Sequence, residues 1–175
     1  MGVKSMIRFL TAGLLTAGLL AFGLSGPVSA LDKPQGKVVL TVTGKITETN
    51  GSAGAEFDLA MLDALPGRTA RMKTPWTEGE TTFSGPLCRA ILAAAGANGT
   101  APIVVRALND YAADVPLEDC KNLDMILATK INGEPIPVRA KGPLFVIYPF
   151  DKDPSLYNEK YFARSVWQVK SIEIR

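Results

Sequence analysis

Histidine is absent from this sequence, and its absence excludes several kinds of active site. A serine–histidine–aspartate triad cannot form, and neither can a cysteine–histidine pair, because imidazole is the general base in both. Zinc, copper and iron sites built on imidazole nitrogen are excluded for the same reason. The chain therefore carries neither histidine-dependent nucleophilic catalysis nor an imidazole-bound metal.

Long apolar runs are scarce as well, and the one that exists lies near the N-terminus, from Phe9 to Leu24. Lys4 and Arg8 precede it, and Val28-Ser29-Ala30 supplies small residues at the cleavage positions, which is the order of a secretory signal peptide. A retained membrane anchor is the rival interpretation. The run is shorter than the ~20 residues that a spanning helix needs, which favours the signal peptide.

We expect residues 1–30 to be a cleaved signal peptide and residues 31–175 to form one domain in the periplasm. Lys and Arg number 19 in the whole chain, and Asp and Glu number 17. Cleavage removes Lys4 and Arg8 and no acidic residue, so the numbers of basic and acidic residues become equal. A nearly neutral domain lacks the clustered cations that track phosphates, so nucleic acid is not expected as a partner.

Cysteine is nearly absent too, since the chain has only Cys88 and Cys120. The expected compartment permits disulfides, so a structural bridge between the two is one interpretation. The sequence says nothing of their separation in space, which decides whether a bridge can form. The other interpretation is that Cys88, between Leu87 and Arg89 in an apolar segment, is a small core residue.

Short β-branched and apolar stretches dominate the rest of the chain and predict strands. Those strands are expected over residues 38–43, 68–73, 81–83, 103–107, 111–115, 125–131, 144–148 and 166–174. The clearest helix is expected over 86–95, where apolar residues share one face, and shorter helices over 59–64 and 117–123. The pattern predicts an α+β domain with few helices. Residues 150–163 are interpreted as a long polar and aromatic loop with a role such as a lid.

Trp76 lies beside Pro75 in a polar loop, where its large apolar surface is costly unless it packs on something. Packing on the core and stacking on a flat ligand are both open interpretations. Asn109, Asp110 and Tyr111 lie at a tight reversal between two apolar stretches. Asn and Asp favour such turns, which is the structural interpretation. The functional interpretation is that Asp110 makes a bidentate contact to a ligand.

Arg139 and Lys141 form a basic loop before a very apolar strand. Such a pair is usually a solvated strand edge, and its functional interpretation is a clamp for an anion or a carbonyl. Together, a tryptophan for stacking, a carboxylate and a Lys/Arg pair suit a small, flat, nitrogen-rich ligand. The guanidine-like edge of such a ring pairs well with a carboxylate.

Several motifs occur in a fixed order, which gives the chain a resemblance to a known family. The motifs are Thr74-Pro75-Trp76-Thr77, Phe83-Ser84-Gly85-Pro86-Leu87, Ala107-Leu108-Asn109-Asp110-Tyr111, Lys141-Gly142-Pro143-Leu144, Tyr148-Pro149 and Trp167-Gln168. Residues 36–175 thereby resemble the small periplasmic relatives of the molybdopterin-binding domain of sulfite oxidase-type enzymes. The resemblance implies a compact α+β fold with a mixed β-sheet, built around a pterin pocket.

The resemblance also assigns roles to residues of that pocket. It implies that Trp76 stacks on the pterin and that Asp110 is the carboxylate for the amino edge of the ring. Asn109 and Tyr111 follow as further pterin-binding residues, and so do the two cations of the basic loop, Arg139 and Lys141.

One feature of those enzymes is missing here. They hold molybdenum through a cysteine thiolate that precedes the segment matching Phe83–Leu87, and residues 68–82 contain no cysteine. Cys88 falls in the helix that follows, while the metal requires a soft ligand. Close relatives also carry a histidine where this chain has Lys73. We therefore expect a pterin as the ligand, no tightly bound cofactor, no molybdenum and no enzymatic activity.

Members of the short exported branch resemble pterin-binding regulators of cyclic di-GMP signalling, and hence of biofilm formation. The resemblance implies a non-catalytic protein that signals its ligand state to the periplasmic domain of a membrane-bound partner. That partner would be a GGDEF/EAL-type enzyme or a histidine kinase. The alternative is a molybdopterin-dependent oxidoreductase or a subunit of one, with Cys88 or Cys120 as metal ligand. A structural adaptor that has lost the ligand is a third interpretation.

Overall fold

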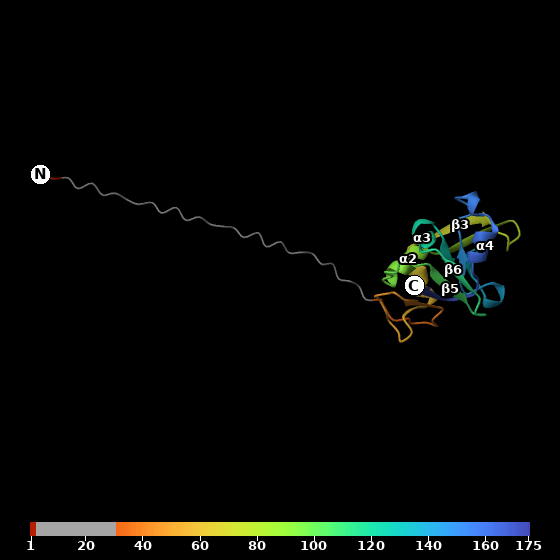
Figure 1. Ribbon diagram of the computed structural model, residues 1–175, viewed down its shortest axis with the longest axis horizontal. Coiled ribbons are helices and arrows are strands. Elements are labelled where there is room, and N and C mark those ends of the chain that lie inside the picture. Colours follow the sequence, from red (N-terminus) through yellow and green to blue (C-terminus); the bar gives the residue numbers. More distant parts are fainter. Residues whose placement is uncertain (3–30) are drawn as a thin grey trace.

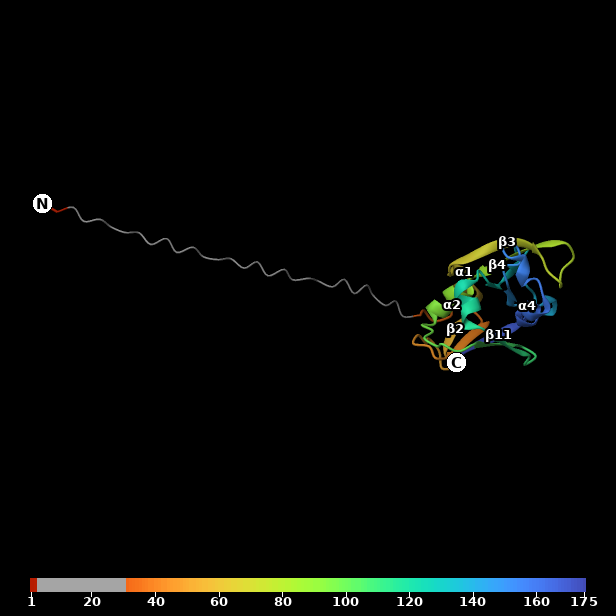
Figure 2. The same cartoon turned by 45° about the horizontal axis from the view of Figure 1, so that its top comes forward.

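The computed structural model describes residues 1–2 and 31–175 of the chain. The predicted signal peptide therefore lies outside the described residues, its first two residues aside, and stays a prediction. None of the helices described is long and apolar enough to cross a membrane. Within the described part, α1–α4 and β1–β11 build a mixed structure with three sheets, which confirms the predicted α+β class (Figures 1 and 2).

A five-stranded sheet forms the base of the domain, in the order β2-β1-β11-β5-β6. Its strands are β1 (Leu40–Gly44), β2 (Ala55–Phe57), β5 (Ile103–Ala107), β6 (Ala112–Val115) and β11 (Val169–Ile174). β1 and β11 run parallel, and the other neighbours are antiparallel. The last strand of the chain is thus central in the sheet, which fixes the position of the segment that leads into it.

A second sheet has the order β3-β4-β8-β9, and β7 and β10 pair as a separate ribbon. The bounds are β3 (Gly67–Lys73), β4 (Glu80–Pro86), β7 (Ile126–Ala128), β8 (Lys130–Ile131), β9 (Glu134–Pro135) and β10 (Phe145–Ile147). The single strand predicted over 125–131 is therefore divided at Thr129. The buried Thr129 hydroxyl donates to Asp63, 2.7 Å away, and its backbone N–H donates to Ser84, so the ladder is interrupted there.

The helices are α1 (Leu59–Ala64), α2 (Cys88–Ala94), α3 (Leu117–Asn122) and α4 (Glu159–Arg164), with 3₁₀ turns at Val138–Ala140 and Pro154–Leu156. The Asp58 carboxylate caps α1 by accepting from the Met61 N–H at 2.9 Å, and the helix has the bounds expected from the sequence. The helix predicted over 86–95 begins later than expected, because Pro86 still pairs with Gly67 in the sheet.

The interpretation of residues 150–163 as a loop is wrong, because this segment contains a 3₁₀ turn and the start of α4. Asn158 caps α4 by accepting from the Lys160 N–H at 3.1 Å. Tyr161 and Phe162 pack against the core from this helix. In both views α4 lies on the other side of the domain from α2 (Figures 1 and 2).

A buried polar network fastens α4 to the core. The hydroxyl of Tyr148, which is fully buried, donates to the Asp119 carboxylate on α3 at 2.9 Å. Arg164 at the end of α4 reaches the same carboxylate at 3.0 Å. Burial, with the nearby Asp119 charge, raises the pKa of Tyr148 well above its ordinary value, so the phenol stays a donor. One carboxylate therefore joins α3, the end of β10 and α4.

Replacing Asp119 by alanine is expected to lower the free energy of unfolding by about 2–3 kcal/mol, because the Arg164 guanidinium and the Tyr148 hydroxyl both lose their acceptor. Tyr148→Phe removes a single hydrogen bond and should cost about 1 kcal/mol. Urea unfolding followed by circular dichroism measures both values. Equal stabilities of wild type and Asp119→Ala would contradict the role given to this carboxylate.

A second carboxylate, that of Asp124, is held between Lys152 and Arg89, the latter at 2.8 Å. The hydrogen bonds from Lys152 and Arg89 lower the pKa of Asp124 from 3.8 to about 2. The charged form is thus favoured in the folded state. Its stabilisation is complete above the ordinary pKa and is lost as the pH falls from about 4 to about 2.

Between about pH 4 and pH 2, the free energy of unfolding of Asp124→Asn should fall by about 1 kcal/mol less than that of the wild type. This value is reduced for solvent screening. Urea titrations at several pH values in this window test it. An unchanged slope of stability against pH would show that Asp124 gains nothing from its two cations.

Candidate functional site

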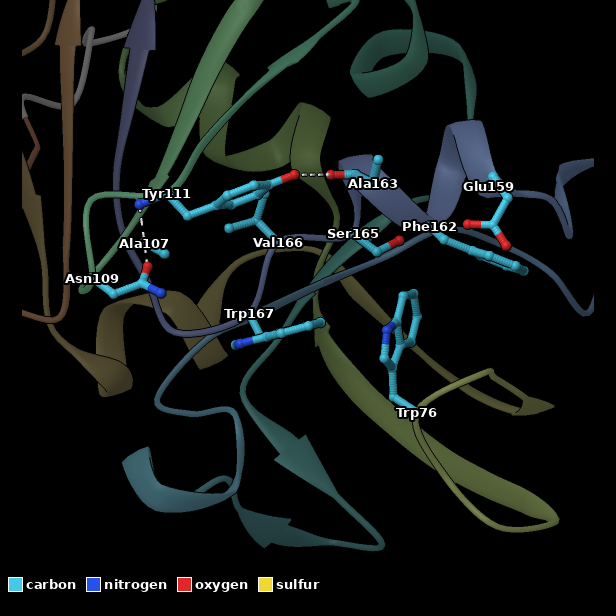
Figure 3. A pocket seen from close by; sticks show the side chains of 10 residues that line it. All are labelled: Trp76, Ala107, Asn109, Tyr111, Glu159, Phe162, Ala163, Ser165, Val166 and Trp167. Carbon is cyan, nitrogen blue, oxygen red and sulfur yellow. Dashed lines mark hydrogen bonds between the residues drawn. The ribbon is translucent and has the colours of Figure 1, made fainter.

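A cavity of about 370 Å³ opens between α4, the β5–β6 turn, the β3–β4 loop and the segment before β11 (Figure 3). Its size is that of a small-molecule site. The residues that line it are Trp76, Ala107, Asn109, Tyr111, Glu159, Phe162, Ala163, Ser165, Val166 and Trp167. Four of these are aromatic, so the pocket offers flat apolar walls with a few polar groups.

The first wall is Trp76, in the loop between β3 and β4. The buried Thr74 hydroxyl lies 2.8 Å from that of Thr77 and accepts from the Trp76 N–H at 3.4 Å, which closes the loop locally. The indole makes edge-on contacts with Phe145 and Phe162, with ring centres 5.2 and 5.7 Å apart. Trp76 is only half-buried, so it both packs on the core and presents a face to the pocket.

The second wall is Trp167, whose ring centre is 6.3 Å from that of Trp76. Its side chain keeps 40% of its surface exposed. The next residue, Gln168, has a left-handed backbone (φ 55°), and its N–H donates to the Lys141 carbonyl at 2.9 Å. Because of this turn, Trp167 lies outside the regular strand β11. The Lys141 ammonium lies over the Trp167 indole, 5.4 Å from the ring centre.

The turn between β5 and β6 supplies the polar side of the pocket. Ala107 and Tyr111 close a three-residue loop, with the Ala107 N–H donating to the Tyr111 carbonyl at 2.8 Å. The Asn109 side-chain oxygen accepts from the Tyr111 N–H at 3.1 Å. The Tyr111 hydroxyl donates to the Ala163 carbonyl at 3.0 Å, which ties the turn to α4 across the pocket rim (Figure 3).

Glu159, in the first turn of α4, lies on the other side of the pocket from Asn109 (Figure 3). It is the only one of the ten lining residues with a charged side chain. No ion pair within the described part of the chain uses its carboxylate. The pocket therefore combines aromatic walls, an amide at one end and a carboxylate at the other.

The structure brings Trp76, Asn109 and Tyr111 together in one pocket, but it does not place Asp110 among the lining residues. Asp110 has a left-handed backbone (φ 66°) at the last position of the turn, a conformation that Asp tolerates. Its exposed carboxylate accepts from Lys170 at 2.6 Å, and this hydrogen bond lowers the pKa of Asp110. The observed backbone and contact of Asp110 therefore agree with the structural interpretation, in which it is a turn residue.

The two predicted cations do not line the pocket either. Arg139 lies exposed in the 3₁₀ turn Val138–Ala140, and Lys141 reaches the pocket only through its contact with the Trp167 ring. Sequence reasoning gave no role in the pocket to Glu159, Phe162 or Trp167. The available signals were the Asn158 cap before Glu159 and the closing Trp167-Gln168 motif.

A thiolate-bound metal at this site would need a free cysteine side chain in the pocket. Cys88 and Cys120 form a disulfide that joins α2 to α3, with Cα atoms 5.2 Å apart, and neither lines the pocket. Within the described residues, no three Cys, Asp or Glu side chains gather into a possible metal site. The residues present fit a flat heteroaromatic ring, and they do not fit a metal that needs a cysteine thiolate.

Comparison with known proteins gives a family and a fold. The family model described as "Oxidoreductase molybdopterin binding domain" matches residues 56–174. Among solved structures, the sulfane dehydrogenase SoxCD from Paracoccus pantotrophus is similar, with 19% sequence identity and a TM-score of 0.55. The match covers 77% of this chain and 37% of that chain, and at this identity it shows the fold alone. No curated protein matches.

These matches confirm the molybdopterin-binding fold expected from the ordered motifs. They contradict the expectation of no enzymatic activity and favour the oxidoreductase alternative, because the matching family is described as an oxidoreductase domain. That expectation rested mainly on the missing cysteine. A missing metal ligand limits which group the pocket can hold, but it does not remove the chain from an oxidoreductase family.

Proposed function

Because this chain belongs to the family of oxidoreductase molybdopterin binding domains, we propose that it is a component of an oxidoreductase and that its part is to bind a pterin-class ring. The observation that carries the proposal is the pocket walled by Trp76, Trp167, Tyr111 and Phe162. Indole faces stack on flat heteroaromatic rings, and such contacts are typically worth ~1–3 kcal/mol per ring.

The polar groups of the pocket support a nitrogen-rich ring rather than a hydrocarbon. Asn109 and Glu159 lie at its two ends, where they can meet donors and acceptors on opposite edges of a planar ligand. A few polar groups of this kind fix the orientation of a ring that the aromatic walls hold. The site thus suits the ring of the family's pterin cofactor, while the described residues offer no thiolate to its metal.

Isothermal titration calorimetry with a reduced and an oxidised pterin tests the proposal. We expect saturable binding of at least one of them at one site per chain, with a dissociation constant well below 1 mM. Absence of heat and of saturation up to millimolar pterin would refute it. Mass spectrometry of the protein purified from its native host would show in addition whether a pterin, with or without molybdenum, accompanies the chain.

The openness of the pocket favours a second candidate function, the reporting of ligand state to a membrane-bound signalling protein. Tyr111 and Trp167 keep 49% and 40% of their surfaces exposed, so a ligand there can exchange with solution. The proposed partner is the periplasmic domain of a GGDEF/EAL-type enzyme or of a histidine kinase. This role requires export, and a mature N-terminus at Leu31 in the periplasmic fraction would support it.

A pull-down with the periplasmic domain of such a partner, with and without pterin, tests the second function. We expect the amount captured to change at least threefold on adding pterin if the chain reports its ligand state. Capture that does not depend on pterin, or no capture in either state, would contradict this reporting role and leave a part in an oxidoreductase as the proposed function.

A further inference from the structure

Three exposed apolar side chains gather in a groove on the outer face of the five-stranded sheet. Val38, Leu108 and Val138 come from segments far apart in the sequence, yet all three line one cavity of about 530 Å³. Thr41 on β1, whose two neighbours in the strand are core residues, also lines it, so the groove lies on the face turned away from the core. Single exposed apolar side chains need no explanation, but a group of them marks a binding surface.

The walls of this groove are held together by Gln168. Its backbone carbonyl accepts from the Leu108 N–H at 2.9 Å, and its side-chain amide donates to the Val138 carbonyl at 2.8 Å. Gln168 has a left-handed backbone, which residues other than glycine adopt uncommonly. The apolar side chains of the two walls are therefore fixed in position without a partner, and a preformed surface loses less conformational entropy when it binds.

The charged residues at the groove are basic. Lys37 and Lys170 line it, and none of its lining residues, all of them in the described part of the chain, is acidic. Lys170 pairs with Asp110, but Lys37 forms no ion pair with any described residue. Arg139 is exposed in the turn Val138–Ala140 at the edge of the groove, and it is likewise absent from the ion pairs among residues 31–175. The groove thus combines apolar walls with positive charge that the described residues leave uncompensated.

We infer that this groove is the docking site for a segment of a partner protein in which an apolar side chain lies between acidic residues. The apolar side chain fills the space between Val38, Leu108 and Val138, and the carboxylates face Lys37 and Arg139. A buried apolar anchor supplies affinity, while complementary charge sets the orientation and speeds association. The groove and the aromatic pocket share no lining residue, so the inference goes beyond the binding of a ring.

The charges disfavour two other occupants. A second copy of this chain, related by a two-fold axis, would set its own Lys37 against the cations of the first copy, and like charges weaken such a contact. Anionic membrane surfaces attract clusters of about four to eight Lys or Arg. The groove has two lysines, and its apolar side chains are aliphatic, whereas aromatic residues are typical of membrane interfaces.

Photo-crosslinking of the full chain in its native host tests the inference. The photoreactive amino acid p-benzoyl-L-phenylalanine replaces Val138, and mass spectrometry identifies the molecule to which it attaches on irradiation. We expect an adduct with one other protein, through a peptide that has acidic residues on both sides of an apolar one. The same amino acid in place of Tyr157, which is exposed outside both cavities, is the control for exposure and should not give this adduct.

Reversal of one charge tests the acidic character of the partner. Lys37→Glu, combined with the photoreactive residue at position 138, should lower the yield of the adduct at least about threefold, because an attractive contact becomes repulsive. Lys45→Glu is the matched control, since Lys45 is also exposed and outside the groove, and it should leave the yield unchanged. Melting temperatures check that both variants fold.

Several results would overturn the inference. They are an adduct with a second copy of the chain or with a membrane lipid, no adduct at position 138, an equal adduct at position 157, or an unchanged yield in Lys37→Glu. Pterin binding is measured separately on Lys37→Glu by calorimetry and should equal that of the wild type, because Lys37 does not line the aromatic pocket. Failure of docking and failure of ring binding are therefore distinguishable.

Discussion

Trp76→Ala is expected to weaken the binding of a pterin by a factor of roughly 5 to 150, which corresponds to the ~1–3 kcal/mol that a stacked aromatic contributes. Trp76 contributes one flat wall of the pocket, and its contacts with Phe145 and Phe162 hold it in place. The same substitution removes these edge-on contacts, so we also expect the free energy of unfolding to fall by about 2 kcal/mol. Calorimetry and urea unfolding measure the two effects.

The two effects of Trp76→Ala can be separated with two further variants. Trp76→Phe keeps a stacking ring and should restore most of the affinity. Val138→Ala shortens an exposed apolar side chain outside the pocket and should change neither affinity nor stability by much. If Trp76→Ala lowered stability but left pterin affinity unchanged, Trp76 would be a core residue only, and the stacking interpretation would be wrong.

Removal of the disulfide is expected to have the largest effect on stability. The Cys88–Cys120 bridge closes a loop with a sequence separation of 32 residues, so the chain-entropy model gives about 3–4 kcal/mol. The bond also lies in the core, where both cysteines are at most 5% exposed. We expect the Cys88→Ala/Cys120→Ala variant to melt about 10 °C below the wild type.

Pterin affinity should be nearly unchanged in this double variant at a temperature where it is folded, because α2 and α3 do not line the pocket. Treatment of the wild type with a reductant should reproduce the lower melting temperature, and the double variant should not respond to the reductant. A reductant response of the double variant, or equal melting temperatures of the two proteins, would contradict a structural role for the bridge.

Local signals in the sequence were sufficient for much of the fold. The helix expected over 59–64 and the strand expected over 103–107 are observed at those bounds as α1 and β5. The errors arose where distant contacts override local pattern. Residues 125–131 read as one strand, but Thr129 is drawn to Ser84 and Asp63 from another part of the chain. α4 was missed because its aromatic residues have no helical period over so short a span.

The pocket was predictable in part, for a related reason. Trp76, Asn109 and Tyr111 lie in motifs whose order pointed to a ring-binding fold, and the structure gathers them in one cavity. The resemblance assigned the role of the carboxylate to Asp110, whose side chain is not among the residues that line the cavity. The left-handed backbone of the turn directs Asp110 to Lys170, and Glu159 reaches the pocket from α4 instead. Sequence adjacency does not give side-chain direction.

The central claim is that the pocket lined by Trp76 and Trp167 binds a pterin-class ring. These are the only two tryptophans in the chain, and both line the pocket, so intrinsic tryptophan fluorescence reports on this site. Titration with a pterin should quench the emission in a saturable manner at one ligand per chain. Emission that does not change at pterin concentrations where calorimetry detects binding would place the ligand elsewhere and contradict the claim.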